Sequence, residues 1–152
     1  MDSAIQIRKY KSTDFNSAIE VYKNLFKFYK IKFDLEESKK FFSIRSRFEQ
    51  YYTLVAFDSE KKVVGLAFTE VLVEETQKTS GYIKLIYVEE KYRMKGIMSD
   101  LINAALKYFA EIKVDTVRIY LRNENLPYLD YYQQKLGFTP IITIVEKSLK
   151  SD

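Results

Sequence analysis

The stretch that decides the fold is residues 85–98, which read LIYVEEKYRMKGIM. Its first four residues are apolar or aromatic and predict a buried strand, and the apolar spacing from Ile97 to Ile112 predicts a long amphipathic helix. A short basic loop with Gly96 joins the two. The first N–H groups of a helix have no acceptor within it, so this arrangement suits a phosphate or pyrophosphate. One glycine alone would fit an ordinary strand-to-helix connection equally well.

On both sides of this stretch the sequence alternates between helical and strand patterns. Helical spacing of apolar residues predicts helices over 15–29, 34–48 and 97–112 and a short one over 127–136. Asp34 and Glu37 have the spacing of a capping box, and the aromatic residues of the first two helices are expected to pack in the core. Alternating or β-branched runs predict strands at 4–10, 51–57, 63–73, 82–88, 116–121 and 138–145.

The order of these elements, β-α-α-β-β-β-α-β-α-β, fixes much of the sheet. Two strands joined by the long helix must run parallel, whereas 51–57 and 63–73 form an antiparallel hairpin. The predicted fold class is therefore α/β (α+β), with a mixed central sheet of about six to seven strands flanked by about four helices. With 152 residues and no linker-like segment, we expect a single domain over 1–152.

Composition excludes several kinds of chemistry. The chain has no Cys and no His, so thiolate nucleophiles, zinc–cysteine sites, imidazole bases and histidine-bound metals are absent, and we expect no metal. The net charge of +4 comes from lysines interleaved with acids, which indicates a solvated surface rather than a nucleic-acid partner. Neither a secretory signal nor a membrane-length apolar run is visible, so a cytoplasmic protein with no membrane partner is expected.

Several motifs resemble one known family. Val88-x4-Arg93-x2-Gly96 resembles the acyl-coenzyme A motif of the GNAT (Gcn5-related N-acetyltransferase) family. Further matches follow this motif along the chain. Val117–Leu121 resembles the next strand of the family, and Asn125 and Tyr132 have its Asn-x6-Tyr spacing. Gly137-Phe138 resembles its Gly-Phe pair, and Val145–Leu149 resembles its closing strand. The order of the predicted elements also agrees with the fold of that family, so the resemblance covers nearly the whole chain.

Three positions depart from the family pattern. Met98 occupies the place of a small residue, and we expect its side chain to turn into the core and leave only its N–H for the ligand. Glu90 replaces a common proline. Tyr132 is five residues before Gly137, one more than usual, so Tyr131 competes with it for the same role.

The resemblance implies transfer of an acetyl group from acetyl-coenzyme A to a primary amine by direct attack in a ternary complex. It places the cofactor along the predicted strand end and loop, with ten residues in contact: Ile86, Val88, Arg93, Met94, Lys95, Gly96, Ile97, Met98, Ser99 and Asn125. The amide of Val88 would polarise the thioester carbonyl, and Tyr132 would protonate the departing thiolate. Asn125 could instead cap the helix that follows it.

The base that accepts the proton of the amine is less defined. Without histidine, the choices are a water chain or a carboxylate. Among the carboxylates, Glu70 is the preferred candidate, and Glu74 and Glu75 are the alternatives. The acceptor also stays open among polyamines, aminoglycosides, amino acids, protein N-termini and protein lysines.

Two other classes of function compete with acetyl transfer. A non-catalytic coenzyme A-binding module on the same fold is favoured by Met98 and by the missing base. A basic nucleic-acid binder would show strongly salt-dependent affinity. The last strand could also pair edge to edge in a homodimer.

Overall fold

The computed structural model describes residues 4–150 of the chain. Its internal contacts divide it into two compact units, one ending at Tyr120 and the other beginning at Leu121, and each is described by itself. The single domain expected over 1–152 stays a prediction, and its first three and last two residues lie outside the described range.

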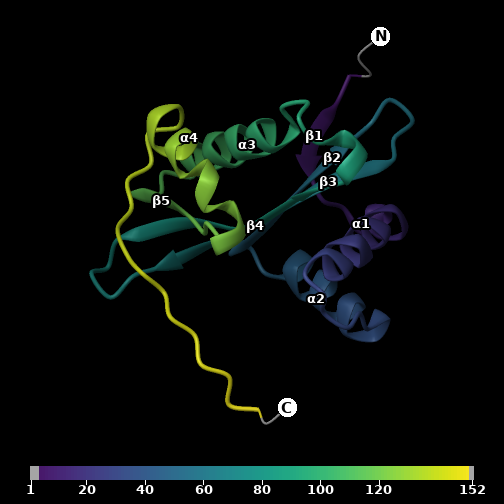
Figure 1. The fold of residues 1–152 in the computed structure, drawn as a ribbon, viewed down its shortest axis with the longest axis horizontal. Coiled ribbons are helices and arrows are strands. Elements are labelled where there is room, and N and C mark those ends of the chain that lie inside the picture. The colour runs from purple at the N-terminus through teal and green to yellow at the C-terminus, as the bar shows by residue number, and fades with distance from the viewer. Residues whose placement is uncertain (1–3, 151–152) are drawn as a thin grey trace. The chain divides into compact units, whose positions relative to one another are not determined.

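The first unit is built on a five-stranded sheet in the order β1-β2-β3-β4-β5 (Figure 1). The strands are β1 (Gln6–Lys9), β2 (Tyr51–Phe57), β3 (Val63–Val73), β4 (Thr79–Val88) and β5 (Thr116–Ile119). Strands β1 to β4 pair antiparallel, and β4 pairs parallel with β5 across the long helix. The mixed α/β sheet, the hairpin and the parallel crossover are therefore confirmed.

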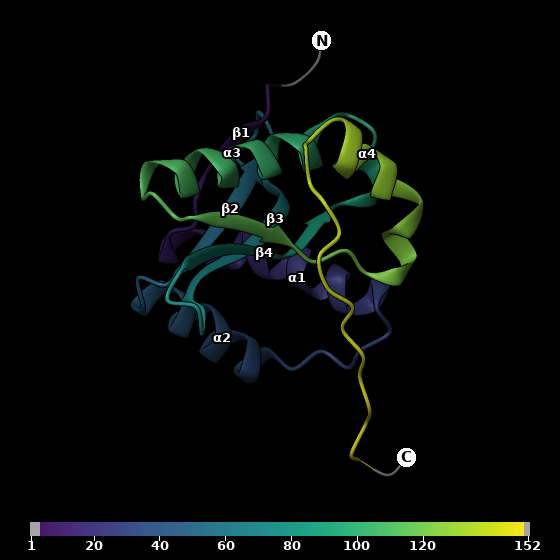
Figure 2. The same ribbon diagram turned by 90° about the vertical axis from the view of Figure 1, so that its left-hand side faces the viewer.

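Helices cover both faces of this sheet. Helices α1 (Phe15–Phe28) and α2 (Leu35–Arg47) lie on one face and α3 (Ile97–Glu111) lies on the other (Figure 2). Asp34 accepts a hydrogen bond from the N–H of Glu37 at 2.9 Å, as the capping pattern predicts.

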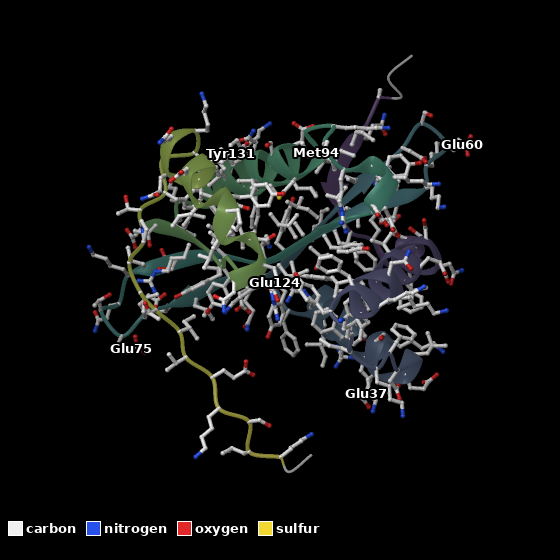
Figure 3. All side chains as sticks on the ribbon, viewed as in Figure 1. Glu37, Glu60, Glu75, Met94, Glu124 and Tyr131 are labelled. Atoms are coloured by element: carbon white, nitrogen blue, oxygen red, sulfur yellow. The ribbon has the colours of Figure 1, made fainter. Side chains whose placement is uncertain are left out.

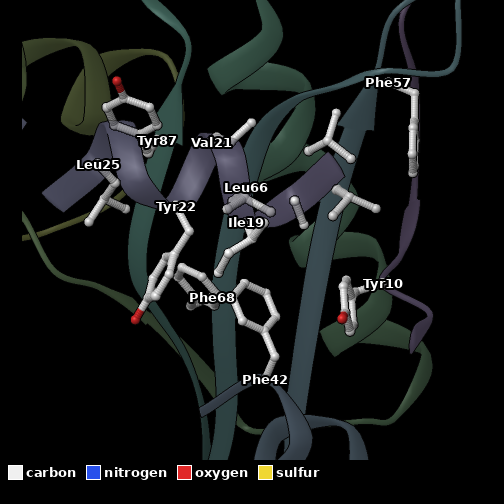
Figure 4. Close-up of a cluster of buried hydrophobic side chains, with 13 residues drawn as sticks. Tyr10, Ile19, Val21, Tyr22, Leu25, Phe42, Phe57, Leu66, Phe68 and Tyr87 are labelled. Carbon is white, nitrogen blue, oxygen red and sulfur yellow. The ribbon is translucent and has the colours of Figure 1, made fainter. Parts of the chain in front are cut away.

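The aromatic residues of α1 and α2 pack in the main hydrophobic core, as the sequence predicts. The ring of Tyr22 stacks on Phe41 at 5.5 Å and meets Phe42 and Phe68 edge-on. Figure 4 shows the rings of Tyr22, Phe42 and Phe68 between the two helices and the sheet. Edge-to-face pairs of this kind add stability beyond their buried area, and they fix the two helices against the sheet.

On the α3 face the helix and sheet approach closely at Gly81. A Cβ added to Gly81 would lie 2.6 Å from the ring of Phe109, a fully buried side chain. We expect Gly81→Ala to lower the free energy of unfolding by about 1–3 kcal/mol, because the core cannot accept the extra methyl group without shifting. Chemical denaturation measures this loss. Gly65→Ala is the matched control: its Cβ would be 3.4 Å from Leu101, so a loss as large there would contradict the packing argument.

The second unit contains a 3-10 helix at Asn123–Tyr128 and helix α4 at Leu129–Gln134. The predicted helix over 127–136 is thus shorter, and Pro127 lies inside the 3-10 turn rather than opening the helix. Residues 138–149 form neither a helix nor a strand.

The predicted last strand over 138–145 is wrong, and with it the count of six to seven strands. Within residues 4–150 this segment joins no ladder, and its apolar side chains from Ile141 to Val145 are 64–89% exposed. β-branched composition indicates a preference for extended backbone, but a strand also needs a neighbouring edge for its hydrogen bonds. Pro140 removes one donor from the segment as well.

Some strand ends also differ from the prediction. β4 begins at Thr79 rather than Tyr82, because Thr79 pairs with Val73 and bonds to Asp115 despite the polar composition there. β5 ends at Ile119, two residues early, because the parallel ladder stops at that point.

Candidate functional site

Strand β4 has an open edge at its C-terminal end. The ladder between β4 and β5 ends where Ile83 pairs with Ile119, closed by a 3.0 Å bond from the N–H of Tyr120 to the carbonyl of Ile83. The ladder between β4 and β3 continues to Val88. In the described part of the first unit, residues 84–88 therefore have a strand on one side only.

A β-bulge at Lys84 determines which backbone groups face this open edge. Phe68 pairs with Leu85 and Thr69 pairs with Ile83, so Lys84 is the extra residue in β4. Beyond the bulge, the N–H of Glu89 donates to Val64 in β3 at 2.9 Å. Because the groups of an antiparallel strand alternate in direction, those of Ile86 and Val88 point away from β3, toward the open edge.

The loop after β4 turns sharply before α3. Met94 and Gly96 both have left-handed backbones, with φ of 63° and 81°. The side chain of Met94 is exposed, as Figure 3 shows. Helix α3 begins at Ile97 without a side-chain cap from Gly96, and a Cβ at Gly96 would meet nothing within 4 Å. Left-handed turns and a helix start direct successive N–H groups into one concave space, which is suited to an anion.

Contacts to three other elements hold this loop in place. The Nε of Arg93 donates to the carbonyl of Val88 at 2.9 Å, and its guanidinium lies 5.2 Å from the ring of Phe28 in α1. Asn24 of α1 donates to Glu89 at 2.7 Å. Arg93 therefore closes the loop onto β4 and α1. It was predicted as a phosphate contact, and its observed bonds give it a positioning role.

The third contact joins Tyr92 to the β2–β3 turn. The hydroxyl of Tyr92 donates to Asp58 at 2.9 Å, while Lys91 and Lys95 lie over the Tyr92 ring at 5.6 and 5.5 Å. The N–H of Lys62, and after it the hydroxyl of Tyr92, hold the pKa of Asp58 below its usual range. Tyr92 thus links the two lysines of the loop to a fixed carboxylate.

Removing this link should loosen the loop without unfolding the protein. We expect Tyr92→Phe to weaken coenzyme A binding about 3- to 10-fold, because a hydrogen bond to a carboxylate that orders the loop is lost. Calorimetry measures the affinity. The effects of Tyr92→Phe and Asp58→Asn should not add in the double variant, since each breaks the same contact.

Asp115→Asn is the matched control for this pair. Asp115 also accepts a backbone N–H and a hydroxyl, both from Thr79, at 2.8 and 3.1 Å. It lies at the opposite end of β4 from the loop. Equal losses of affinity in Asp115→Asn and Tyr92→Phe would show that the Tyr92 contact has no special role.

The first turn of α3 holds the remaining loop residues predicted to bind the cofactor. Ile97 is fully buried against the sheet, while Met98 and Ser99 are half-buried and Lys95 is exposed. The side chain that turns fully into the core is therefore that of Ile97, whereas the side chain of Met98, for which we expected this position, is only half-buried. The binding roles of these residues stay predictions, since backbone N–H groups, not these side chains, would contact a phosphate.

Glu70, the predicted base, is engaged by a lysine. Its carboxylate forms an ion pair with Lys84 at 3.0 Å, and Lys84 also donates to the hydroxyl of Tyr120 at 2.9 Å. Burial opposes the charge of Lys84, but the hydrogen bonds to Tyr120 and Glu70 outweigh it and raise the pKa of Lys84. The carboxylate of Glu70 therefore faces a permanent ammonium group.

Glu74, another candidate base, is held in a similar way. It accepts hydrogen bonds from the hydroxyl of Tyr82 and from Arg118, the second at 3.2 Å, and Arg118 donates to Tyr82 at 2.8 Å. The Tyr82 bond is the main cause that lowers the pKa of Glu74. Glu75 lies in the exposed turn between β3 and β4, at the opposite end of β4 from the loop before α3 (Figure 3).

Sequence reasoning missed Lys84, Arg118, Tyr82 and Tyr120. The available signal was weak: a charged residue in each of two otherwise β-forming strands. Placing them together requires the sheet register, which pairs Tyr82 with Arg118 and Tyr82 with Glu70.

The second unit contains the predicted acid. Tyr132 is buried, and this burial is the main cause that raises its pKa. Its ring lies 5.8 Å from that of Tyr131. Asn125 lies inside the 3-10 helix, and Tyr128 is the residue before α4, so the prediction that Asn125 caps this helix is wrong.

An opened sheet edge that leads to the start of a helix defines an α/β protein whose geometry suits an extended, phosphate-bearing ligand. Residues 18–138 match the model of the Acetyltransferase (GNAT) family, and the chain belongs to this family. It is a GNAT acetyltransferase family member. No curated protein matches the sequence significantly.

Solved structures share the fold at low sequence identity. A transcriptional regulator from Bacillus halodurans C-125 is 13% identical, with a TM-score of 0.81 over 96% of this chain and 100% of its own. The aminoglycoside N-acetyltransferase AAC(6')-Iy in complex with CoA is 14% identical, with a TM-score of 0.82 over 99% and 98%. The aminoglycoside acetyltransferase meta-AAC0020, from an uncultured soil metagenomic sample and in complex with sisomicin, is 20% identical, with a TM-score of 0.75 over 97% of both chains.

None of the helices within residues 4–150 combines the length and the apolar character that crossing a membrane requires.

Proposed function

We propose that this protein transfers the acetyl group of acetyl-coenzyme A to a primary amine. The open edge of β4 carries the proposal: the backbone groups of Ile86 and Val88 face a side that has no strand, and the edge leads directly to the loop at the start of α3. The residues present fit this cofactor. The peptide groups of Ile86 and the N–H of Val88, which face the side without a strand, suit the amides of pantetheine, and the open space at Gly96 suits the pyrophosphate.

Bound acetyl-coenzyme A supplies an activated thioester, at whose carbonyl carbon the amine nitrogen forms a bond as the bond to sulfur breaks. The N–H of Val88 stabilises the charge that develops on the carbonyl oxygen. The carbonyl of Val88 is occupied by Arg93, which fixes the direction of the peptide plane that follows it. Amides from Met94 to Ser99 hold the phosphates.

Two proton transfers complete the reaction. Tyr132 gives its hydroxyl proton to the departing sulfur, a role assigned from the family resemblance and compatible with its raised pKa. The amine gives up its proton to water, because Glu70 and Glu74 both hold cations already. Asn125 is proposed to orient the cofactor.

The acceptor is a small-molecule amine or the amine of a peptide or protein. The related structures include aminoglycoside acetyltransferases, which makes an aminoglycoside one candidate. Their identities to this chain are 14% and 20%, so the likeness shows the fold alone.

Release of free coenzyme A from acetyl-coenzyme A tests this proposal. With a mixed panel of amines, the protein should release the thiol in proportion to the acetylated amine that mass spectrometry detects. A protein that binds acetyl-coenzyme A but acetylates none of the amines would instead be a non-catalytic coenzyme A-binding module. That second candidate is favoured by the ion pairs of Glu70 and Glu74, since each carboxylate already has a cation as its partner.

A further inference from the structure

Two ion pairs lie together on the sheet face that α1 and α2 cover. Glu70 follows Phe68 of the core by two residues in β3, so both side chains point to this face. Glu70 pairs with Tyr82 of β4, and Tyr82 pairs with Arg118 of β5, so these side chains lie on the same face. Their hydrogen bonds and ion pairs form two groups of three side chains, which meet where Lys84 lies over the ring of Tyr82. We call these six side chains the edge cluster: Glu70, Glu74, Tyr82, Lys84, Arg118 and Tyr120.

The edge cluster adjoins the open edge of β4. Lys84 is the bulge residue, two positions before Ile86, and Tyr120 donates its N–H to Ile83 at the last pair of the β4–β5 ladder. The Nζ of Lys84 lies over the rings of Tyr82 and Tyr120 at 4.7 and 4.2 Å. A molecule that reaches the open edge from this face passes these side chains.

The cations of the cluster are more exposed than its carboxylates. The side chains of Lys84 and Arg118 are 29% and 36% exposed, against 15% for Glu70 and 17% for Glu74. An approaching molecule therefore meets an ammonium and a guanidinium, with the carboxylates behind them.

A third cation lies beneath the cluster. Arg45 is 9% exposed and gives its hydrogen bonds to neutral oxygens, the hydroxyl of Thr53 at 3.1 Å and the carbonyl of Thr69 at 2.6 Å. Its charge acts on Glu70 without an ion pair between them, since Glu70 pairs with Lys84. Three cations thus face two carboxylates, and the edge cluster together with the buried Arg45 has one positive charge in excess.

We propose that the acceptor is an amine that also carries a carboxylate, as a free amino acid does, rather than a polycationic amine. The inference rests on the proposed function. Lys84 and Arg118 attract and orient the carboxylate, while a second ammonium group on the acceptor would be repelled or would have to displace them. Lys84 also favours the neutral form of a nearby amine, which is the form that attacks the thioester.

Matched acceptors test the charge alone. Each common amino acid is compared with its own carboxamide, and spermidine and sisomicin serve as polycationic acceptors, in an assay of thiol release with acetyl-coenzyme A. We expect kcat/KM for the best amino acid to exceed that for its amide by about tenfold or more. Equal values for acid and amide, or faster turnover of spermidine or sisomicin, would overturn the inference.

Variants then identify the cations responsible. Lys84→Gln and Arg118→Gln should each raise KM for the amino acid and bring the acid-to-amide ratio close to one, while KM for acetyl-coenzyme A stays unchanged. Lys78→Gln is the control, because Lys78 lies in the exposed β3–β4 turn. If Lys84→Gln fails to fold, Arg118→Gln decides the question, since Arg118 is the more exposed of the two.

Binding of the product separates this inference from the proposed function. In the presence of coenzyme A, the N-acetyl amino acid should bind more tightly than the N-acetyl amide, whether or not turnover is seen. If coenzyme A binds and no such preference exists, the inference alone is wrong. If coenzyme A itself does not bind, the proposed function falls, and the inference falls with it.

Discussion

Replacement of Gly96 by glutamate is expected to weaken coenzyme A binding about 100-fold or more. The left-handed backbone at Gly96 turns the chain into α3, and a Cβ there would meet no atom within 4 Å. A carboxylate there would occupy the proposed pyrophosphate position and repel its charge, at a helix end that otherwise attracts anions. Calorimetric titration with coenzyme A measures the loss.

Two controls separate the charge from the backbone strain. Gly96→Ala adds strain of roughly 1–2 kcal/mol at a left-handed position but no charge, so its affinity should fall much less. Gly137→Glu adds the same side chain at a second left-handed glycine, with φ of 73° and equally open surroundings. It should lose stability as Gly96→Glu does and still bind coenzyme A. Unchanged affinity in Gly96→Glu would move the phosphate site elsewhere.

Removal of the hydroxyl of Tyr132 is expected to lower kcat by tens-fold or more. General acid catalysis contributes about 10²–10⁴-fold in rate, and coenzyme A affinity should stay nearly the same because no binding group is lost. Burial raises the pKa of Tyr132, and an acid can donate only while it is protonated, below that pKa. The rate of the wild type should therefore persist through neutral pH and fall only in the alkaline range. Steady-state kinetics of Tyr132→Phe with a working acceptor measures the loss.

Tyr131→Phe is the matched control for this experiment. The two tyrosines are neighbours on the same short helix, about 100° apart around its axis, and their rings meet edge-on. Tyr131→Phe should leave kcat almost unchanged. If Tyr131→Phe loses activity and Tyr132→Phe does not, the alignment with the family motif is displaced by one residue.

Local patterns were sufficient for most elements of the first unit. The apolar spacing of α1, α2 and α3, the polar turn between β2 and β3, and the cap at Asp34 all depend on neighbours within a few residues, and each prediction is confirmed. The segment over 138–145 shows the limit of such patterns. Its composition is that of a strand, but a strand also needs an edge to pair with, which lies outside the segment.

The candidate site divides in the same way. Its loop follows from the sequence, because a glycine between a buried strand and an amphipathic helix must turn the chain at a helix start. The role of Arg93 does not, since its side chain bonds to the carbonyl of Val88, and the torsions of a long side chain are set by its surroundings. Glu70 was predicted as a candidate base because the chain has no histidine, and the sequence does not show that the ammonium of Lys84 lies 3.0 Å from its carboxylate.

The sequence by itself determined the order of the strands and helices as far as α4, the parallel crossover through α3, and the turn with Gly96 before α3. Only the tertiary structure decided that β5 stops pairing at Ile119 and that the bulge at Lys84 turns Ile86 and Val88 to the open edge. The physical reason is that backbone direction alternates residue by residue along a strand. A single extra residue exchanges the two sides, and its position depends on the register between strands, which no local pattern specifies.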